Sequence, residues 1–211
     1  DLIVVRENTE GLYAGVGGRA HCGQPAEVAL QTQVFTRRGV ERIIRYAFDL
    51  ARTRPRRHLT SATKSNACQY SFVLWDEVFD EVAAGYPDVT TNVQLIDALA
   101  ARCVTQPESL DVIVASNLFG DILSDLTGAL AGSLGLAAST NINPTRTFPS
   151  MFEPVHGSAP DIAGRGIANP LAAIWSGALM LEFLGQPAAA QAIVAAIEET
   201  TAAGTVLTPD L

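Results

Sequence analysis

Two aspartates stand four residues apart in a largely apolar stretch of this sequence. Asp121 and Asp125 belong to "SNLFGDILSDL", residues 116–126. Residues four apart lie one above the other on a helix, so two like charges there cost stability unless a cation sits between them. Hard divalent cations prefer carboxylate oxygens, and Mg²⁺ typically takes one or two carboxylates together with substrate and water. The spacing indicates a metal site; a capping aspartate plus an exposed one is the alternative.

A lysine and a third carboxylate are the next candidates for chemistry. Lys64 in "TSATKSN" is the only lysine among the 14 lysines and arginines. A lysine amine can lose its proton when it is buried or next to other cations, whereas arginine stays protonated, so Lys64 is a candidate general base. A lysine left by chance is the alternative. Asp97 in "QLIDALAARC" has an apolar setting similar to that of the first two aspartates, although alone it resembles an ordinary aspartate at a helix start.

The segment "RENTEGLY" begins with Arg6 and ends with Tyr13. An arginine at the end of a strand suits bidentate binding of a carboxylate. A tyrosine can serve as a general acid. Each residue taken separately is also compatible with a structural role.

Two other motifs carry no function. Eight arginines lie between residues 37 and 57, but Glu41 and Asp49 interrupt them and apolar residues recur at helical spacing. This pattern predicts a solvated helix face, and the net charge of −8 argues against nucleic acid or an anionic membrane as the main partner. "GVGGRA", residues 15–20, fits G-x-G-x-x-A, but no helix-like segment follows it, as a dinucleotide-binding turn requires.

The composition bounds the class of protein. The 211 residues are 48% hydrophobic, enough for one large domain or two small ones. Three cysteines, without metal-type spacing, favour reduced thiols in the cytoplasm. The longest apolar stretch, Pro170–Gly185, is too short to span a bilayer and contains Glu182, so it predicts a buried helix.

The elements that must position these residues alternate between strands and helices. This alternation predicts an α/β fold with a largely parallel sheet. A glycine-rich turn is expected at Gly15–Ala20. Strands are expected at Leu2–Val5, Glu27–Phe35, His58–Thr63, Val89–Ile96 and Asp111–Ala115, and helices at Arg38–Arg52, Ala67–Ala84, Asp97–Val104 and from Ser116 onward.

The last third of the sequence begins with a segment rich in proline and glycine. Residues 135–169 carry four prolines and several glycines, which predicts a long functional loop. Within it, "FEPVHGSAPDIAGRGIANP" has glycines, a histidine and an aspartate suited to ribose hydroxyls, so it is a candidate nucleotide loop. Two helices should follow, one after Asn169 as N-cap with Pro170 at the first helical position, the other from Pro187 to a C-cap at Gly204.

Five strings together resemble the metal-dependent β-decarboxylating dehydrogenases, which act on isocitrate, isopropylmalate, tartrate or D-malate. They are "RENTEGLY", "TKSN", "LIDALAARCV", "SNLFGDILSDL" and "FEPVHGSAPDIAGRGIANP", in the order of that family. "TSATKSN" and "NPTRTFPSMFEPVHGSAPDI" are most similar to the tartrate/D-malate branch. The resemblance implies an isopropylmalate-dehydrogenase-like two-domain fold with a mixed, largely parallel sheet. Residues 1–132 would form the substrate, metal and dimerisation domain, with a β arm at about 13–36, and 133–211 part of the cofactor-binding domain.

The resemblance also implies roles for the candidate residues. Asp121 and Asp125, with Asp97 of the partner subunit, would hold Mg²⁺ or Mn²⁺ in a homodimer with shared active sites. Lys64, also reaching across the dimer, would take the proton of the substrate hydroxyl. After hydride transfer and loss of CO₂, Tyr13 would protonate the enol.

The remaining roles concern binding. Arg6 would grip a substrate carboxylate. Relatives that use NADP have a lysine–tyrosine pair where this chain has Asp161 and Ile162, and because an aspartate would repel a 2′-phosphate, NAD is expected. The residues matching the family's cofactor site are Asn66, Glu153, His156, Gly157, Ser158, Ala159, Asp161, Ile162 and Asn169.

The predicted function is therefore NAD- and metal-dependent oxidative decarboxylation of a small 2-hydroxy dicarboxylate of the D-malate or tartrate type. The alternatives are the 3-isopropylmalate dehydrogenase of leucine biosynthesis and a non-catalytic dimerising fragment. Family members begin earlier in sequence, with part of the cofactor site and an arginine pair that binds substrate. We therefore expect an incomplete first domain, and "TVLTPDL" also looks clipped.

Overall fold

The computed structural model describes residues 2–205 and 207–211. By its internal contacts the chain divides into two compact units, Asp1–Ser124 and Asp125–Leu211. The division falls inside helix α4 (Asn117–Leu130), somewhat before the expected boundary after residue 132. The roles expected for the two parts stay predictions.

The first unit is built on a four-stranded parallel sheet. Its strands are short and rich in Val, Ile and Thr, which suits strands covered on both faces. All strand pairs are parallel, which confirms the predicted α/β class. The order across the sheet is β1 (Ile3–Arg6), β6 (Val112–Ala115), β4 (His58–Thr63) and β5 (Thr90–Leu95).

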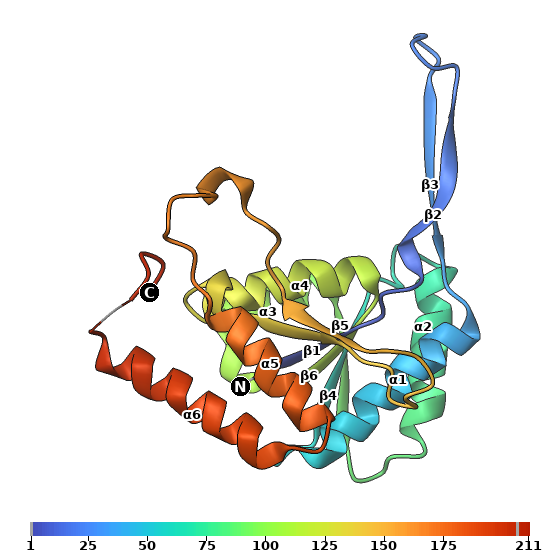
Figure 1. Ribbon diagram of the computed structural model, residues 1–211. Coiled ribbons are helices and arrows are strands. Elements are labelled where there is room, and N and C mark those ends of the chain that lie inside the picture. Colours follow the sequence, from blue (N-terminus) through green and yellow to red (C-terminus); the bar gives the residue numbers. More distant parts are fainter. Residues whose placement is uncertain (1, 206) are drawn as a thin grey trace. The chain divides into compact units, whose positions relative to one another are not determined.

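Helices α1 (Arg37–Thr53) and α2 (Ser71–Ala83) cover one face of this sheet (Figure 1). The Thr36 side chain caps α1 by accepting a hydrogen bond from the backbone N–H of Gly39 at 3.0 Å. Apolar residues at helical spacing fill the core between the helices and alternate residues of the strands. Its members include Val5, Ile44, Phe48, Leu59, Phe72, Trp75, Phe79, Val112 and Val114.

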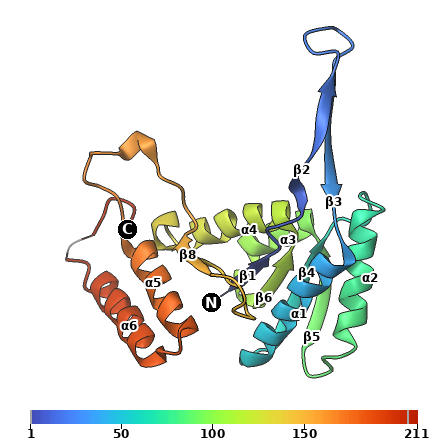
Figure 2. The same ribbon diagram turned by 45° about the vertical axis from the view of Figure 1, so that its right-hand side comes forward.

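Helices α3 (Ile96–Thr105) and the first part of α4 lie on the other face (Figure 2). Leu99 and Cys103 of α3, Leu123 of α4 and Ile113 of β6 are fully buried. A short 3₁₀ turn, η1 (Pro107–Ser109), leads into β6. Helices therefore pack on both faces of the sheet. This packing positions the residues that follow the ends of its strands.

A β-hairpin projects from this unit (Figure 1). Strands β2 (Gly11–Ala20) and β3 (Val28–Val34) pair antiparallel. The expected turn at Gly15–Ala20 is therefore wrong, since these residues form the outer half of β2. Gly17 serves close strand pairing, because a Cβ on this residue would lie 2.1 Å from the backbone oxygen of Leu30.

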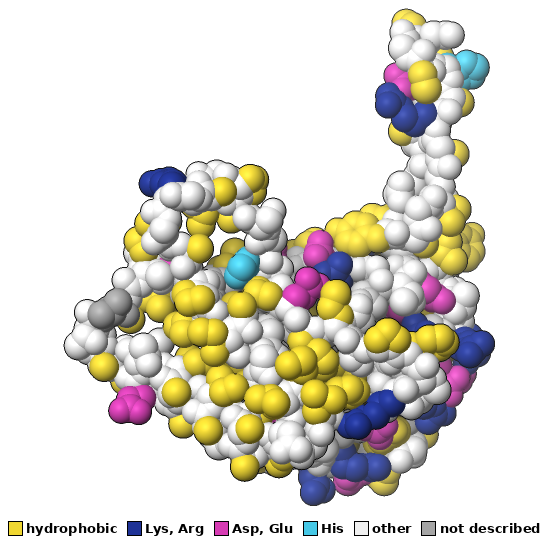
Figure 3. All heavy atoms as spheres, viewed as in Figure 1, with side chains coloured by type: hydrophobic (Ala, Val, Ile, Leu, Met, Phe, Trp, Pro, Cys, Tyr) yellow, Lys and Arg dark blue, Asp and Glu magenta, His cyan; other side chains and the backbone are white. Residues whose placement is uncertain are grey.

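The second unit contains helices α5 (Leu171–Phe183) and α6 (Pro187–Ala203) and a hairpin of β7 (Ala138–Asn141) with β8 (Met151–Pro154). The 3₁₀ turns η2 (Leu134–Leu136) and η3 (Pro160–Ile162) complete it. The expected loop at 135–169 is thus partly wrong, because it includes the hairpin. Hydrophobic side chains gather on the surface of the molecule in Figure 3. The large exposed hydrophobic residues of this unit include Ile174, Trp175, Met180 and Leu184.

The ends of these helices follow the sequence signals closely. Gly204 caps α6 in the left-handed conformation, which confirms the predicted C-cap. Helix α5 begins at Leu171, one residue after the expected start, yet the Asn169 side chain still accepts from the Leu171 N–H at 2.9 Å. In the described part of the chain, no helix combines the length and the apolar character that crossing a membrane requires.

Candidate functional site

The parallel sheet of the first unit brings the ends of its four strands to one edge. Arg6 ends β1, Asn117 follows β6 after one residue, Lys64 directly follows β4, and Asp97 follows β5 as the second residue of α3. In open α/β sheets, ligands bind beyond the carboxyl ends of the strands. Four polar side chains from distant parts of the sequence thus share the edge at which chemistry is expected.

Arg6, Asp121 and Tyr13 form one hydrogen-bonded group at this edge. The Arg6 Nη1 atom lies 2.6 Å from Asp121 Oδ1. The Tyr13 hydroxyl donates to the other carboxylate oxygen, Oδ2, at 3.0 Å. Neither charged side chain is fully buried, with 33% of Arg6 and 43% of Asp121 exposed, so the group remains accessible to a ligand.

The aliphatic part of the Arg6 side chain packs closely against Gly120. A Cβ on Gly120 would lie only 2.6 Å from Arg6 Cγ and 2.7 Å from Arg6 Cβ. Real Cβ atoms do not approach so closely, and glycine is the residue that allows such an approach. Gly120 therefore lets the stem of Arg6 lie directly on α4, next to Asp121.

Tyr13 occupies the base of the hairpin. Its side chain is exposed, and its pKa is raised, chiefly because its hydroxyl donates a hydrogen bond to the Asp121 carboxylate. The phenol therefore keeps its proton over the range in which most proteins work. A proton donor held on a carboxylate suits the general-acid role expected from the sequence.

Lys64 and Asp97 form a separate ion pair. The Lys64 Nζ atom lies 2.7 Å from Asp97 Oδ1, and the hydrogen bond from Lys64 is the main reason that the pKa of Asp97 is lowered. The two side chains are 27% and 67% exposed. Lys64 opens a turn in which its carbonyl accepts from Ala67 and Cys68, and Asn66 lies exposed in this turn.

The donor set suits a hard divalent ion. Asp121 and Asp125 are four residues apart on α4, and no hydrogen bond or ion pair of the Asp125 carboxylate occurs among the described residues. Asp121 uses one hydrogen bond on each oxygen, and a carboxylate oxygen can accept more than one. The described residues include no group of three acidic, histidine or cysteine side chains placed to hold an ion. One copy of the chain therefore supplies fewer than three such ligands in this structure.

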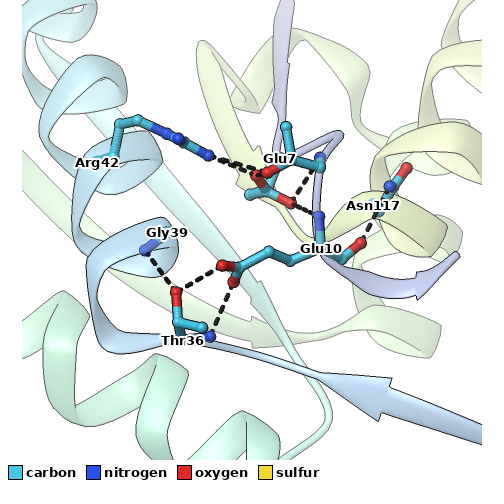
Figure 4. Close-up of polar contacts among 7 residues, drawn as sticks. Glu7, Glu10, Thr36, Gly39, Arg42 and Asn117 are labelled. Atoms are coloured by element: carbon cyan, nitrogen blue, oxygen red, sulfur yellow. Dashed lines mark hydrogen bonds and ion pairs between the residues drawn. The ribbon is translucent and has the colours of Figure 1, made fainter. Parts of the chain in front are cut away.

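Three residues of this edge escaped the sequence analysis. The Asn117 side chain contacts Arg6 and the backbone of Glu10, and the Glu7 carboxylate is 5% exposed and accepts from Arg42 at 2.9 Å (Figure 4). Glu7 also accepts from the backbone N–H groups of Thr9 and Glu10. Glu7 and Glu10 stand inside "RENTEGLY", and Asn117 comes just after a predicted strand end. These positions in the sequence were the signals that could have identified the three residues.

The expected cofactor residues of the second unit lie in an exposed segment. Glu153 lies in β8, and the residues from His156 to Asp161 are exposed. The His156 Nδ1 atom lies 2.9 Å from the neighbouring Gly157 carbonyl oxygen. Ala159 is left-handed, with φ 41°, just before η3. Gly157, Ser158, Ala159, Asp161 and Ile162 follow His156 in the sequence. In the described part of the chain, the side chains of Ser158 and Asp161 make no hydrogen bond. Two hollows in this unit are lined by other residues, including Trp175.

Asn169 is the anchored end of this segment. Its Nδ2 donates to Asp210 Oδ2 at 2.9 Å, and Ser133 donates to the same oxygen. Burial alone would raise the pKa of Asp210, but hydrogen bonds that include those from Ser133 and Asn169 outweigh it and lower this pKa to about 2. Asp210, which the sequence analysis did not single out, therefore fixes the side chain of Asn169.

Known proteins with similar sequences and a similar fold are dehydrogenases. A probable tartrate dehydrogenase/decarboxylase of Agrobacterium vitis is 58% identical over 211 residues, 59% of that protein. The decarboxylating D-malate dehydrogenase of Escherichia coli is also 58% identical, over 60% of its length. A crystal structure of isocitrate dehydrogenase from Methylococcus capsulatus superimposes with a TM-score of 0.92 at 48% identity, covering 99% of this chain and 60% of that one.

The chain thus spans about three fifths of the length of these relatives. The identities confirm the resemblance to the tartrate/D-malate branch. The sequence pattern of isocitrate/isopropylmalate dehydrogenases matches residues 1–211. The chain belongs to the isocitrate/isopropylmalate dehydrogenase family.

Proposed function

We propose that this chain is the substrate- and metal-binding part, with a portion of the cofactor site, of an NAD- and divalent-metal-dependent dehydrogenase. The reaction is the oxidative decarboxylation of a 2-hydroxy dicarboxylic acid of the D-malate or tartrate type. The observation that supports it most is the hydrogen-bonded group of Arg6, Tyr13 and Asp121 at the carboxyl edge of the parallel sheet. A cation, a proton donor and a carboxylate meet there without being buried.

Each residue of this group has a distinct task. Arg6 carries a permanent charge with several N–H donors, so it binds a substrate carboxylate. Tyr13 holds its proton at the hydroxyl and delivers it to the enol carbon left after decarboxylation. Lys64, once its amine is neutral, takes the proton of the substrate hydroxyl at Nζ.

Asp121 and Asp125 of one copy, with Asp97 of the partner subunit, would hold Mg²⁺ or Mn²⁺. When bound, the ion would supply Lewis acidity, and NAD would serve as the hydride acceptor. The exposed segment that ends at Asn169 would hold the adenosine, and Asp161 there would disfavour the 2′-phosphate of NADP. Asn66, beside Lys64, would lie near the nicotinamide.

A homodimer is part of this proposal. The hairpin of β2 and β3 presents apolar side chains to solvent: Val16 is 46%, Val28 47% and Leu30 66% exposed. Solvent-exposed apolar strands favour pairing with another chain. Pairing of this arm with a second copy would cover them and carry Lys64 and Asp97 to the site of the other copy.

The test is an assay of the full-length polypeptide for NADH formation with Mn²⁺. D-malate, tartrate, isopropylmalate and isocitrate are compared, and D-malate or tartrate should give the highest kcat/KM. A chelator should abolish the reaction. Isopropylmalate as the best substrate would move the enzyme to another branch. The proposal fails if none of the four acids is oxidised, or if the chelator leaves the rate unchanged.

A further inference from the structure

The side-chain amide of Asn117 makes hydrogen bonds through both its oxygen and its nitrogen. Asn117 is the first residue of α4 and only 4% exposed. Its Oδ1 accepts from Arg6 Nε at 3.0 Å and from Arg6 Nη2 at 2.8 Å. Its Nδ2 donates to the backbone carbonyl of Glu10 at 3.0 Å. A buried amide with partners on both ends has one stable orientation.

These contacts fix how the Arg6 guanidinium faces the sheet edge. Nε and Nη2 lie along one side of the planar group, and both point to the same Asn117 oxygen. Nη1 is left to face Asp121, at 2.6 Å. Because an arginine side chain has many rotamers, a two-point contact that selects one of them lowers the side-chain entropy that would otherwise be lost when a ligand binds.

Asn117 is itself held in place from the opposite side (Figure 4). The Glu10 carboxylate accepts from the backbone N–H of Thr36 at 2.8 Å and from the Thr36 hydroxyl. It fills the space over Gly39, where a Cβ would lie 2.5 Å from the carboxylate carbon. The backbone carbonyl that Asn117 binds is thus tied to the N-terminus of α1.

We propose that Asn117 is a positioning residue for substrate recognition: it orients Arg6 so that the guanidinium meets the substrate carboxylate in one geometry. The inference rests on the proposed function, because only there is Arg6 the residue that binds substrate. Asn117 itself touches neither the substrate nor the reacting atoms. Its effect passes through Arg6 alone.

A double-mutant cycle in the full-length protein tests this pathway. Asn117→Ala should raise KM for D-malate by about ten- to a hundred-fold, with a smaller change in kcat, because the misplaced cation weakens binding. In an Arg6→Lys background the same substitution should change KM less than about two-fold. Asn117→Asp keeps the acceptor for Arg6 but loses the donor to the Glu10 carbonyl, so it should recover part of the loss. Equal effects of Asn117→Ala in both backgrounds would overturn the proposal.

A second readout does not depend on activity. In ¹⁵N-resolved NMR spectra, the Arg6 Nε–H proton should exchange slowly with water in the wild-type protein and in Asn117→Asp, and much faster in Asn117→Ala. Unchanged exchange in Asn117→Ala overturns the inference. If no 2-hydroxy acid is turned over by the wild type while the exchange rates behave as expected, the proposed function fails and the positioning of Arg6 by Asn117 stands.

Discussion

The Arg6 group and the segment between β8 and α5 differ in how far the chain itself fixes their geometry. Arg6 makes hydrogen bonds to Asn117 and Asp121, and its stem lies on Gly120. The segment from His156 to Asp161 is exposed, and among the described residues its side chains make one hydrogen bond, between the His156 ring and the Gly157 carbonyl. The first region is organised in the isolated chain, and the second is anchored mainly at Asn169.

This difference suggests a division of labour. Groups that must meet a small, charged substrate gain from a fixed orientation, because less entropy is lost when the substrate binds. A segment that wraps a larger ligand can gain its order from that ligand. Changes at the sheet edge should therefore affect rates strongly, whereas changes at the anchor of the segment should have smaller and more local effects.

The largest effect is expected at Lys64. Lys64→Arg keeps a positive charge beside Asp97, 2.7 Å away in the wild type, but arginine does not release its proton. If Lys64 is the general base, kcat of the full-length enzyme should fall by about a hundred- to ten-thousand-fold. The exposed Arg38, changed to alanine, is a matched control and should leave kcat within about two-fold. A Lys64→Arg enzyme with normal turnover would remove Lys64 from the chemistry.

The second largest effect is expected at Gly120. Gly120→Ala places a methyl group 2.6 Å from Arg6 Cγ, so Arg6 must move away from Asp121. We expect a loss of about 1–3 kcal/mol of stability from overpacking and a fall of about ten- to a hundred-fold in kcat/KM. Thermal unfolding and initial rates measure the two quantities separately.

Gly177→Ala is the matched control for that substitution. Gly177 also lies inside a helix, α5, but a Cβ there meets nothing within 4 Å. Alanine should therefore be neutral or stabilise the protein by about 0.5–1 kcal/mol. Similar behaviour of the two variants would show that Gly120 is not needed for the position of Arg6.

The third prediction concerns the buried Glu7. Its carboxylate accepts from Arg42, from Thr9 and from the Glu10 N–H, and the NH₂ group of a glutamine cannot accept these bonds. Glu7→Gln should cost about 1–3 kcal/mol in urea unfolding. Glu41→Gln, which breaks the exposed pair with Arg45, should cost clearly less, because exposed ion pairs contribute little to stability. Equal costs would mean that the start of the hairpin is not specially fixed.

The smallest effect is expected at the anchor of the second unit. The pKa of Asp210 is about 2 in the folded chain and near 4 when unfolded, so its carboxylate stabilises the fold above about pH 4. This contribution is lost as pH falls from about 4 to about 2. Amides near Asn169 should then exchange faster with solvent. Asp210→Asn should show faster exchange already at neutral pH and little further change on acidification through that range; a wild-type-like profile would contradict the assignment.

The fold could be predicted in good part because local signals and burial agree. His58–Thr63 forms a strand with the expected bounds, and α6 begins at Pro187 and ends before Gly204 as its capping signals indicate. The glycines at 15–20 misled the prediction, since they lie within a strand, where Gly17 allows the close approach of Leu30. The hairpin of β7 and β8 was missed because its short strands stand among prolines.

For the candidate site, the sequence predicted which residues take part but not how they contact one another. Arg6, Tyr13 and Asp121 each carry a chemical signal, but nothing local says that they touch. Arg6 and Asn117 are 111 residues apart, and their hydrogen bonds depend on β1 pairing with β6 in one register. Glu10 and Asp210 were missed for the same reason, because their partners come from other elements.

In the proposed function, carboxylates from two copies of the chain share one divalent ion. A mixed dimer of one full-length Asp97→Asn chain and one full-length Asp121→Asn chain tests it by EPR of bound Mn²⁺. If Asp97 acts across the interface, each homodimer lacks an intact site, whereas the mixed dimer keeps one and binds one Mn²⁺ ion tightly. If all ligands came from one chain, the mixed dimer would have no intact site. Absence of tight Mn²⁺ binding in the mixed dimer would contradict the account.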